Sequence, residues 1–269
     1  MCYILFDRLT PCQRDAREAL RLAVRSLSAG AGEILEASYA GFKPANMDVE
    51  NLVLYNIDAS VGGCFAPGVR KGARFELAAG PRRDPPSGEQ FTCSYRYRLM
   101  GPASELSYWR PIGRLASFSD AGPGKFPASR RLEQAWLAIH RANAEVSATR
   151  AAAGAPFAVF LTLSHLRAKT VAGPELVKAL IDGTVAAFQT SGDPVGLGEI
   201  AARTAAATGE PSGLITQILI DGQRAVLGAA GNLVHLRGAG VQWNLCRSKI
   251  GFWLVTCAFS GFMRLARTR

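Results

Sequence analysis

The sequence predicts an α+β protein: a mixed β-sheet with a β-rich N-terminal half, packed by three to four helices. Three observations lead to this class. Residues 33–100 contain several short apolar segments separated by turns. Apolar residues recur at helical spacing in 10–30 and 174–189, and residues 157–164 form an apolar run typical of a buried strand. Hydrophobic residues make up 48% of the 269 residues and charged residues 19%, so the chain has ample material for a core.

The first predicted helix covers residues 10–30. Thr10, Pro11 and Gln13 match an N-cap, a first-turn proline and a capping-box partner. Apolar residues follow at helical spacing, and an arginine row (Arg14, Arg17, Arg21, Arg25) lies largely off that stripe. Such a row usually faces solvent, although it could also contact phosphate.

The region 33–100 predicts strands at 33–39, 50–57, 73–80 and 90–99. The last of these, "QFTCSYRYRL", alternates: aromatic and apolar side chains point one way, and Arg96 and Arg98 point the other. Together with Arg74 on a neighbouring strand, Arg96 and Arg98 predict a basic sheet face. Because the aromatic residues lie on the opposite face, this arrangement favours contact with a phosphate backbone over base stacking.

The second half begins after an irregular segment at 101–128, which contains "DAGPGKFP" and is the best place for a boundary. We expect a lobe at 1–110, a second lobe at 125–244 and a C-terminal tail at 245–269. The expected elements of the second lobe are helices at 129–152, 174–189 and 197–208, a strand at 157–164, a hairpin around the Asp221-Gly222 turn and a strand at 233–238. Gly183 interrupts the helix at 174–189, which suggests a packing reason.

The segment 250–263, "IGFWLVTCAFSGFM", is uncharged and flanked by basic residues. Its fourteen residues would rise about 21 Å as a helix, too short to cross a bilayer comfortably. It could be a final core element, an interfacial membrane segment or a tail outside the main fold.

The formal net charge is +10, mostly from arginine. This balance favours a polyanionic partner such as nucleic acid, although a coding bias toward Arg and Ala would produce the same composition. None of the six cysteines forms a C-x-x-C pair, and the first residues lack a basic leader. We therefore expect a protein of the reducing cytoplasm.

The stretch "DVENLVLYNID" at 48–58 is a candidate metal site. In a strand, Asp48 and Glu50 would share one face, and clustered carboxylates hold Mg²⁺ in phosphodiester-cleaving enzymes. Because two ligands are not enough, Asp182 or Asp221 would have to complete the site.

Three fragments are similar to the RusA-type Holliday-junction resolvases. "DVENL" at 48–52 resembles their D-x-D-N-L signature, "LVKALID" at 176–182 resembles the lysine element that follows it, and "IDGQ" at 220–223 resembles their D-D-x-Q element. The resemblance implies Mg²⁺-binding aspartates and junction-holding basic residues. The sequence departs from the family in that Asp48 and Lys178 are far apart, whereas the family has them contiguous.

A further candidate site follows the predicted strand at 157–164, where His165, Arg167 and Lys169 come in close succession. Strand ends often carry functional groups, so this cluster could bind phosphate, with His165 as an acid–base group. The alternative is that His165 simply ends the strand.

Three functions follow from these features. The first is a nucleic-acid-associated cytoplasmic protein that binds phosphate without catalysis through five basic residues (Arg74, Arg96, Arg98, Arg167 and Lys169). The second is a Mg²⁺-dependent nuclease that uses five residues (Asp48, Glu50, Asp182, Asp221 and His165). The third is an interaction module whose segment 250–263 docks on a protein partner or a membrane.

Overall fold

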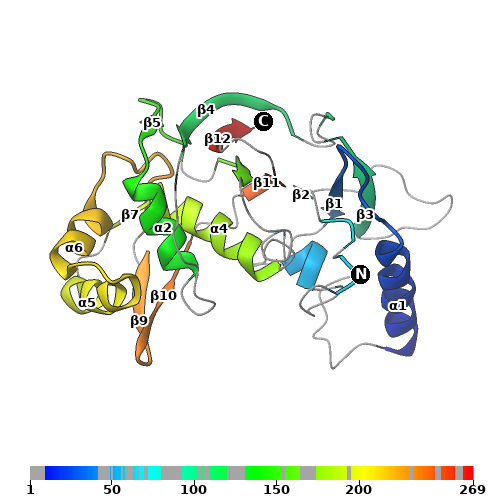
Figure 1. Cartoon of the computed structure of the whole chain (residues 1–269), viewed down its shortest axis with the longest axis horizontal. Helices are drawn as coiled ribbons and strands as arrows, with labels where there is room; N and C mark the ends of the chain where they lie inside the picture. The colour runs from blue at the N-terminus through cyan, green and yellow to red at the C-terminus, as the bar shows by residue number, and fades with distance from the viewer. Residues whose placement is uncertain are drawn as a thin grey trace.

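The computed structural model has an α+β fold in which helices flank one eight-stranded sheet (Figure 1). The fold class expected from the sequence is therefore confirmed. The structure describes residues 10–41, 49, 51–55, 57, 63–65, 67–69, 72–79, 93–101, 104–105, 109–119, 121, 131–152, 155–163, 174–192, 195–230, 233–245, 250–257 and 263–268, with the backbone alone in the last two ranges.

The main sheet is mixed and has the strand order β3-β1-β2-β11-β6-β12-β4-β5. Its strands are β1 (Ile34–Gly41), β2 (Gly72–Ala79), β3 (Cys93–Met100), β4 (Pro111–Phe118), β5 (Ala144–Val146), β6 (Phe157–Leu163), β11 (Ile250–Cys257) and β12 (Met263–Thr268). β1 runs parallel to β2, and β11 runs parallel to β6, whereas the other neighbours are antiparallel. Two small sheets pair β7 (Thr190–Ser191) with β8 (Ala229–Ala230), and β9 (Val234–Arg237) with β10 (Gly240–Trp243).

Strand β11 joins the two halves of the sheet. Its residue Trp253 stands opposite Phe75 of β2 on one side and Val159 of β6 on the other. Of the three alternatives for 250–263, this placement corresponds to the core element. A strand with neighbours on both edges satisfies its backbone groups within the sheet, which suits an uncharged segment.

Helix α1 (Pro11–Arg25) begins as its sequence predicts. The Thr10 hydroxyl accepts a hydrogen bond from the Gln13 amide, and the Gln13 side chain accepts one from the Thr10 amide, which is a complete capping box. Val24 is the single fully buried residue of α1, so the helix packs on the body through a narrow contact.

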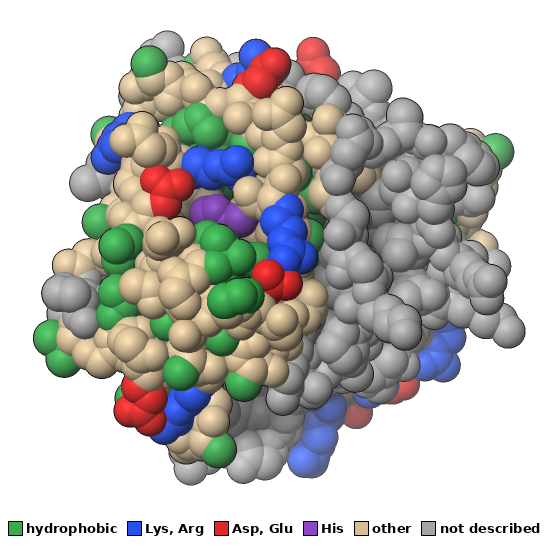
Figure 2. Space-filling view, turned by 60° about the vertical axis from the view of Figure 1, so that its left-hand side comes forward, with side chains coloured by type: hydrophobic (Ala, Val, Ile, Leu, Met, Phe, Trp, Pro, Cys, Tyr) green, Lys and Arg blue, Asp and Glu red, His purple; other side chains and the backbone are tan. Residues whose placement is uncertain are grey.

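Helices α2 (Arg131–Arg141) and α4 (Pro174–Ala187) pack against one another in front of the sheet (Figure 1). Helices α5 (Leu197–Thr208) and α6 (Ser212–Ile220) gather with the β9–β10 hairpin on one side of the molecule, and α1 lies on the opposite side. The side formed by α5, α6 and the hairpin carries hydrophobic side chains between scattered charged ones (Figure 2).

The strand expected at 50–57 is wrong. Asn51–Tyr55 form a short π-helix, η2, in which Leu52, Val53 and Leu54 are all buried. A brief apolar run fits a strand and a buried helical turn equally well, and here tertiary packing selects the helix.

Three other expectations also differ from the structure. The helix expected over 129–152 ends at Arg141, and residues 144–146 join the sheet as β5. The hairpin expected around Asp221-Gly222 is wrong, because residues 212–220 form α6. The segment 101–128, expected to be irregular, contains strand β4.

Gly183 marks the closest approach of α2 and α4. A Cβ added to Gly183 would lie 2.5 Å from the Ala135 Cβ and 2.9 Å from the Trp136 backbone nitrogen. Both distances are shorter than van der Waals contact, so the packing reason inferred from the sequence is confirmed.

We predict that Gly183→Ala destabilises the protein by roughly 1–2 kcal/mol, because overpacking costs more than the helix propensity of alanine returns. The matched control is Gly198→Ala in α5, where an added Cβ meets nothing within 4 Å; there we expect a gain of up to about 1 kcal/mol. Urea unfolding measures both changes. Gains at both positions would contradict the close helix contact.

Candidate functional site

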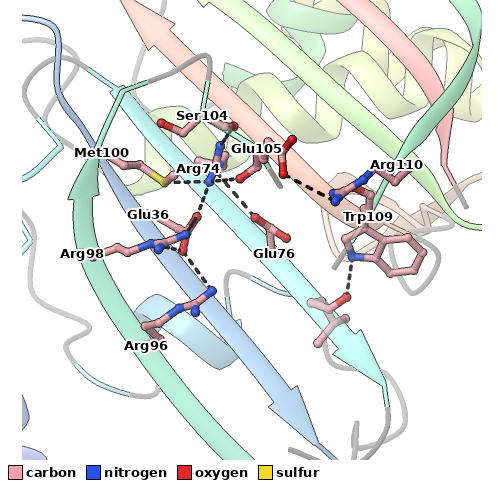
Figure 3. Close-up of polar contacts among 11 residues, drawn as sticks. Glu36, Arg74, Glu76, Arg96, Arg98, Met100, Ser104, Glu105, Trp109 and Arg110 are labelled. Carbon is pink, nitrogen blue, oxygen red and sulfur yellow. Dashed lines mark hydrogen bonds and ion pairs between the residues drawn. The ribbon is translucent and has the colours of Figure 1, made fainter. Parts of the chain in front are cut away.

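The most concentrated group of charged side chains lies on the polar face of β1, β2 and β3. Glu36 of β1 stands directly opposite Arg74 of β2 and directly opposite Arg98 of β3. Directly opposed residues project to the same face of a sheet, so all three side chains meet there. Figure 3 shows Arg96, two residues before Arg98, on the same face.

The Glu36 carboxylate binds three arginines. It accepts a short hydrogen bond from Nη2 of Arg74 and two bonds from Arg98, from Nε at 2.8 Å and from Nη2 at 3.3 Å. Nη2 of Arg96 lies 3.4 Å from the same carboxylate. Glu36 is fully buried, so this carboxylate exchanges its water shell for guanidinium donors.

Arg74 binds the segment that follows β3 and holds it to the sheet. Its Nη1 donates to the Ser104 carbonyl at 2.7 Å, and its Nη2 donates to the Glu105 carbonyl at 3.1 Å. Its Nε lies 3.7 Å from the carboxylate of Glu76, which is also fully buried. Arg74 is 1% exposed, and its guanidinium group binds groups of the protein itself, so this structure does not present it to a ligand.

The arginines keep Glu36 ionised. Burial alone raises the pKa of a carboxyl group, but the hydrogen bonds and charges of Arg98 and Arg74 outweigh burial and hold the pKa of Glu36 below its ordinary value. Glu36 is therefore ionised at neutral pH, and the arginine side chains are arranged around this anion.

Arg96 and Arg98 are the part of this cluster that reaches solvent, since each side chain is 43% exposed. The basic sheet face expected from the sequence thus exists, but Glu36 and Glu76 neutralise most of it. Three arginines and two glutamates leave one net positive charge. Two oriented guanidinium groups on a surface can hold an anion, and no side chain of this cluster is a nucleophile.

The carboxylates expected to hold Mg²⁺ are only partly described by the structure. Asp48 and Glu50 lie outside the described residues, so their pairing stays a sequence-based prediction, while Asn51–Tyr55 after them form a helical turn. Asp182 is buried in α4, and Asp221 follows α6, where its carboxylate accepts a bond from the Gln223 amide. Within the described residues, no group of three or more His, Cys, Asp or Glu side chains could hold a metal ion.

The basic cluster at the end of β6 also lies outside the described residues, because the structure describes this strand to Leu163 and then resumes at Pro174. The roles expected for His165, Arg167 and Lys169 therefore remain sequence-based predictions. The sequence analysis missed Glu36, although "EILEASY" alternates Glu36 and Ser38 with apolar residues in the register that Arg96 and Arg98 need.

A second polar group surrounds His140 at the end of α2. Arg224 donates to the carbonyls of Ile139 and Ala142, which caps the helix, and the Trp136 ring lies 5.2 Å from the His140 ring. Burial, and then the nearby Arg224 charge, lower the pKa of His140 to about 4. A histidine that is neutral at pH 7 with so low a pKa is a weak general base.

Comparison of the chain with protein-family models, with curated proteins and with solved structures found no match in any of the three. Among the described residues, no helix has both the length and the apolar character needed to cross a membrane. The functional argument therefore depends on the geometry of the described residues.

We predict that Glu36→Gln destabilises the protein at pH 7 by about 3 kcal/mol, because it removes a buried carboxylate from Arg74 and Arg98. The control is Glu145→Gln on β5, whose exposed carboxylate lies 3.4 Å from Arg114; there we expect less than about 1 kcal/mol. Urea unfolding at pH 7 compares the two losses. Equal losses at both positions would contradict the buried network.

The loss caused by Glu36→Gln should depend on pH. Because the folded-state pKa of Glu36 is lowered, its contribution is fully present above its unfolded-state value of about 4.3 and disappears as pH falls through the folded-state value. The stability difference between wild type and variant should therefore shrink in acid. A difference that grows as the pH falls would show that Glu36 is protonated in the folded protein at neutral pH.

His140 should make the protein less stable in mild acid. Its pKa is about 4 in the folded chain and about 6.5 in the unfolded chain, so the unfolded state takes up a proton first as pH falls through this window. We predict that His140→Gln flattens the fall in stability between pH 6.5 and 4, with His235→Gln as the control for losing a histidine elsewhere. Unfolding free energies at several pH values test this, and an unchanged slope in His140→Gln would count against it.

Proposed function

We propose that this chain is a nucleic-acid-associated protein that binds the phosphate backbone through Arg96 and Arg98. The observation that supports this most is that a single buried carboxylate, that of Glu36, orients both guanidinium groups while leaving each side chain 43% exposed. An arginine held in place loses less side-chain entropy on binding than a free one, so the pair is prepared for an anion.

Phosphate is the ligand class that suits this pair best. A guanidinium group keeps its charge at any physiological pH, and its planar set of donors matches the oxygens of a phosphate. The excess of ten positive charges over the whole chain adds an attraction that acts before contact. The proposal does not include Arg74, which is buried.

The proposed interface extends beyond this pair. Arg167 and Lys169, which follow β6 in the sequence and lie outside the described residues, are proposed as further phosphate contacts on the sequence argument. We also propose that the protein works in the reducing cytoplasm, where nucleic acid is accessible; the exposed free thiol of Cys12 is compatible with that compartment.

The test is the salt dependence of binding to a labelled duplex, measured by fluorescence anisotropy between 50 and 200 mM salt. We predict that Arg96→Gln with Arg98→Gln weakens binding and reduces the slope of log K against log salt by about 1.8, the value for two lost phosphate contacts. Urea unfolding confirms that the variant is folded under the conditions of the assay.

The control combines Arg114→Gln with Arg141→Gln. These arginines are 50% and 57% exposed and lie close to Glu145 and Glu210, so the control removes the same charge from equally exposed, glutamate-paired positions. We expect it to keep the wild-type slope. If the two double variants lose the same slope, binding depends on total charge, and the proposed site is wrong.

A further inference from the structure

We infer that the ligand of this site is double-stranded nucleic acid, which Arg96 and Arg98 contact without reading the base sequence. This inference rests on the proposed function and narrows its ligand class. It depends on three features of the cluster: how the donors of Arg98 are used, how the two arginines share one anchor, and where the aromatic side chains lie.

The bonds of Arg98 to Glu36 hold its guanidinium group against the sheet. Arginine reads guanine by presenting two donors of one guanidinium group to two acceptors on the base edge. In Arg98, both Nε and Nη2 donate to Glu36, at 2.8 and 3.3 Å. The edge of the guanidinium that carries these two donors therefore faces the protein, and the side chain is held against the sheet instead of extending outward toward the floor of a groove. Phosphates at the surface of a nucleic acid are then the groups within its reach.

Arg96 is tied to the same anchor. Its Nη2 lies 3.4 Å from Oε1 of Glu36, the same oxygen that accepts from Nε of Arg98 at 2.8 Å. The two arginines are two positions apart along β3, roughly 7 Å between their backbones. Because Glu36 is fully buried and lies in the middle of β1, the pair is fixed relative to the sheet. Two charges at a fixed spacing suit a stiff, regularly charged backbone better than a flexible one.

The aromatic residues of β3 cannot provide a stacking surface next to the pair. Tyr95 and Tyr97 lie on the opposite face, where Tyr95 packs edge-on against Tyr39 at 5.3 Å and the Tyr97 hydroxyl donates to the Val53 carbonyl. Proteins that prefer single strands combine a basic groove with exposed aromatic rings on which bases stack. That element is missing from the described residues of β1 and β3 on the arginine face.

Trp109 is the aromatic residue that needs separate consideration. Its indole nitrogen donates to the Leu77 carbonyl of β2 at 2.9 Å, so the ring is tied to a strand two positions away from β3 (Figure 3). The buried Glu76 precedes Leu77 on that strand. Trp109 therefore lies apart from the arginine pair. Without an aromatic ring beside the pair, we expect the charge density of the nucleic acid to decide which form binds more tightly. Duplex DNA carries one charge per about 1.7 Å of its axis.

The experiment measures affinities for four labelled ligands at one salt concentration: a GC-rich duplex, an AT-rich duplex of the same length, and two single strands with the same number of phosphates. We expect equal affinities for the two duplexes within about threefold and weaker binding of both single strands. Arg96→Gln with Arg98→Gln should weaken both duplexes by the same factor, and Trp109→Leu should leave the ratio of duplex to single-strand affinity unchanged.

The outcomes separate the two levels of the argument. A preference above about tenfold for one duplex, lost in the arginine variant, would overturn the inference and leave the proposed function standing. So would tighter binding of single strands, or a loss of single-strand binding alone in Trp109→Leu. If the arginine variant binds every ligand as the Arg114→Gln, Arg141→Gln control does, the proposed function fails as well.

Discussion

The ion network around Glu36 is the constraint on which the first half of the sheet depends. Taking a carboxylate and Arg74 out of water is costly, and the mutual attraction of such groups compensates for this cost only when the geometry is good. The network therefore acts mainly on register. A slip of one residue in β1 would turn Glu36 toward the aromatic face and take it away from both Arg74 and Arg98.

The two faces of β1, β2 and β3 carry different kinds of side chain. One face carries apolar and aromatic side chains into a core shared with η2, α2 and α4, and the other carries the charged network. Arg74 connects the layers on the polar side, because it holds the Ser104 and Glu105 carbonyls over the sheet. The exposed Arg96 and Arg98 are thus oriented by the buried Glu36, so the proposed anion site and the pairing of the strands depend on the same residues.

Local signals in the sequence predicted the elements that local physics decides. The capping box at Thr10 identifies α1, and the alternation in 90–99 identifies β3 and assigns Arg96 and Arg98 to one face. The prediction fails where long-range packing decides: Leu52–Leu54 are helical, residues 212–220 form a helix where a hairpin was expected, and β4 is a strand despite its glycine and proline. The role of Glu36 depends on partners 38 and 62 residues away, which spacing along one strand does not reveal.

The central position of β11 has a consequence for how the protein is made. During synthesis, β2 and β6 leave the ribosome long before residues 250–257, which pair with both of them. Until then β2 presents an open edge and β6 lacks both of its neighbours, β11 and β12. Unpaired strand edges are surfaces on which nascent chains aggregate. Completion of the sheet therefore waits until residues 250–257 have been translated, so chaperone demand in the cell should be set by this strand and not by the helices.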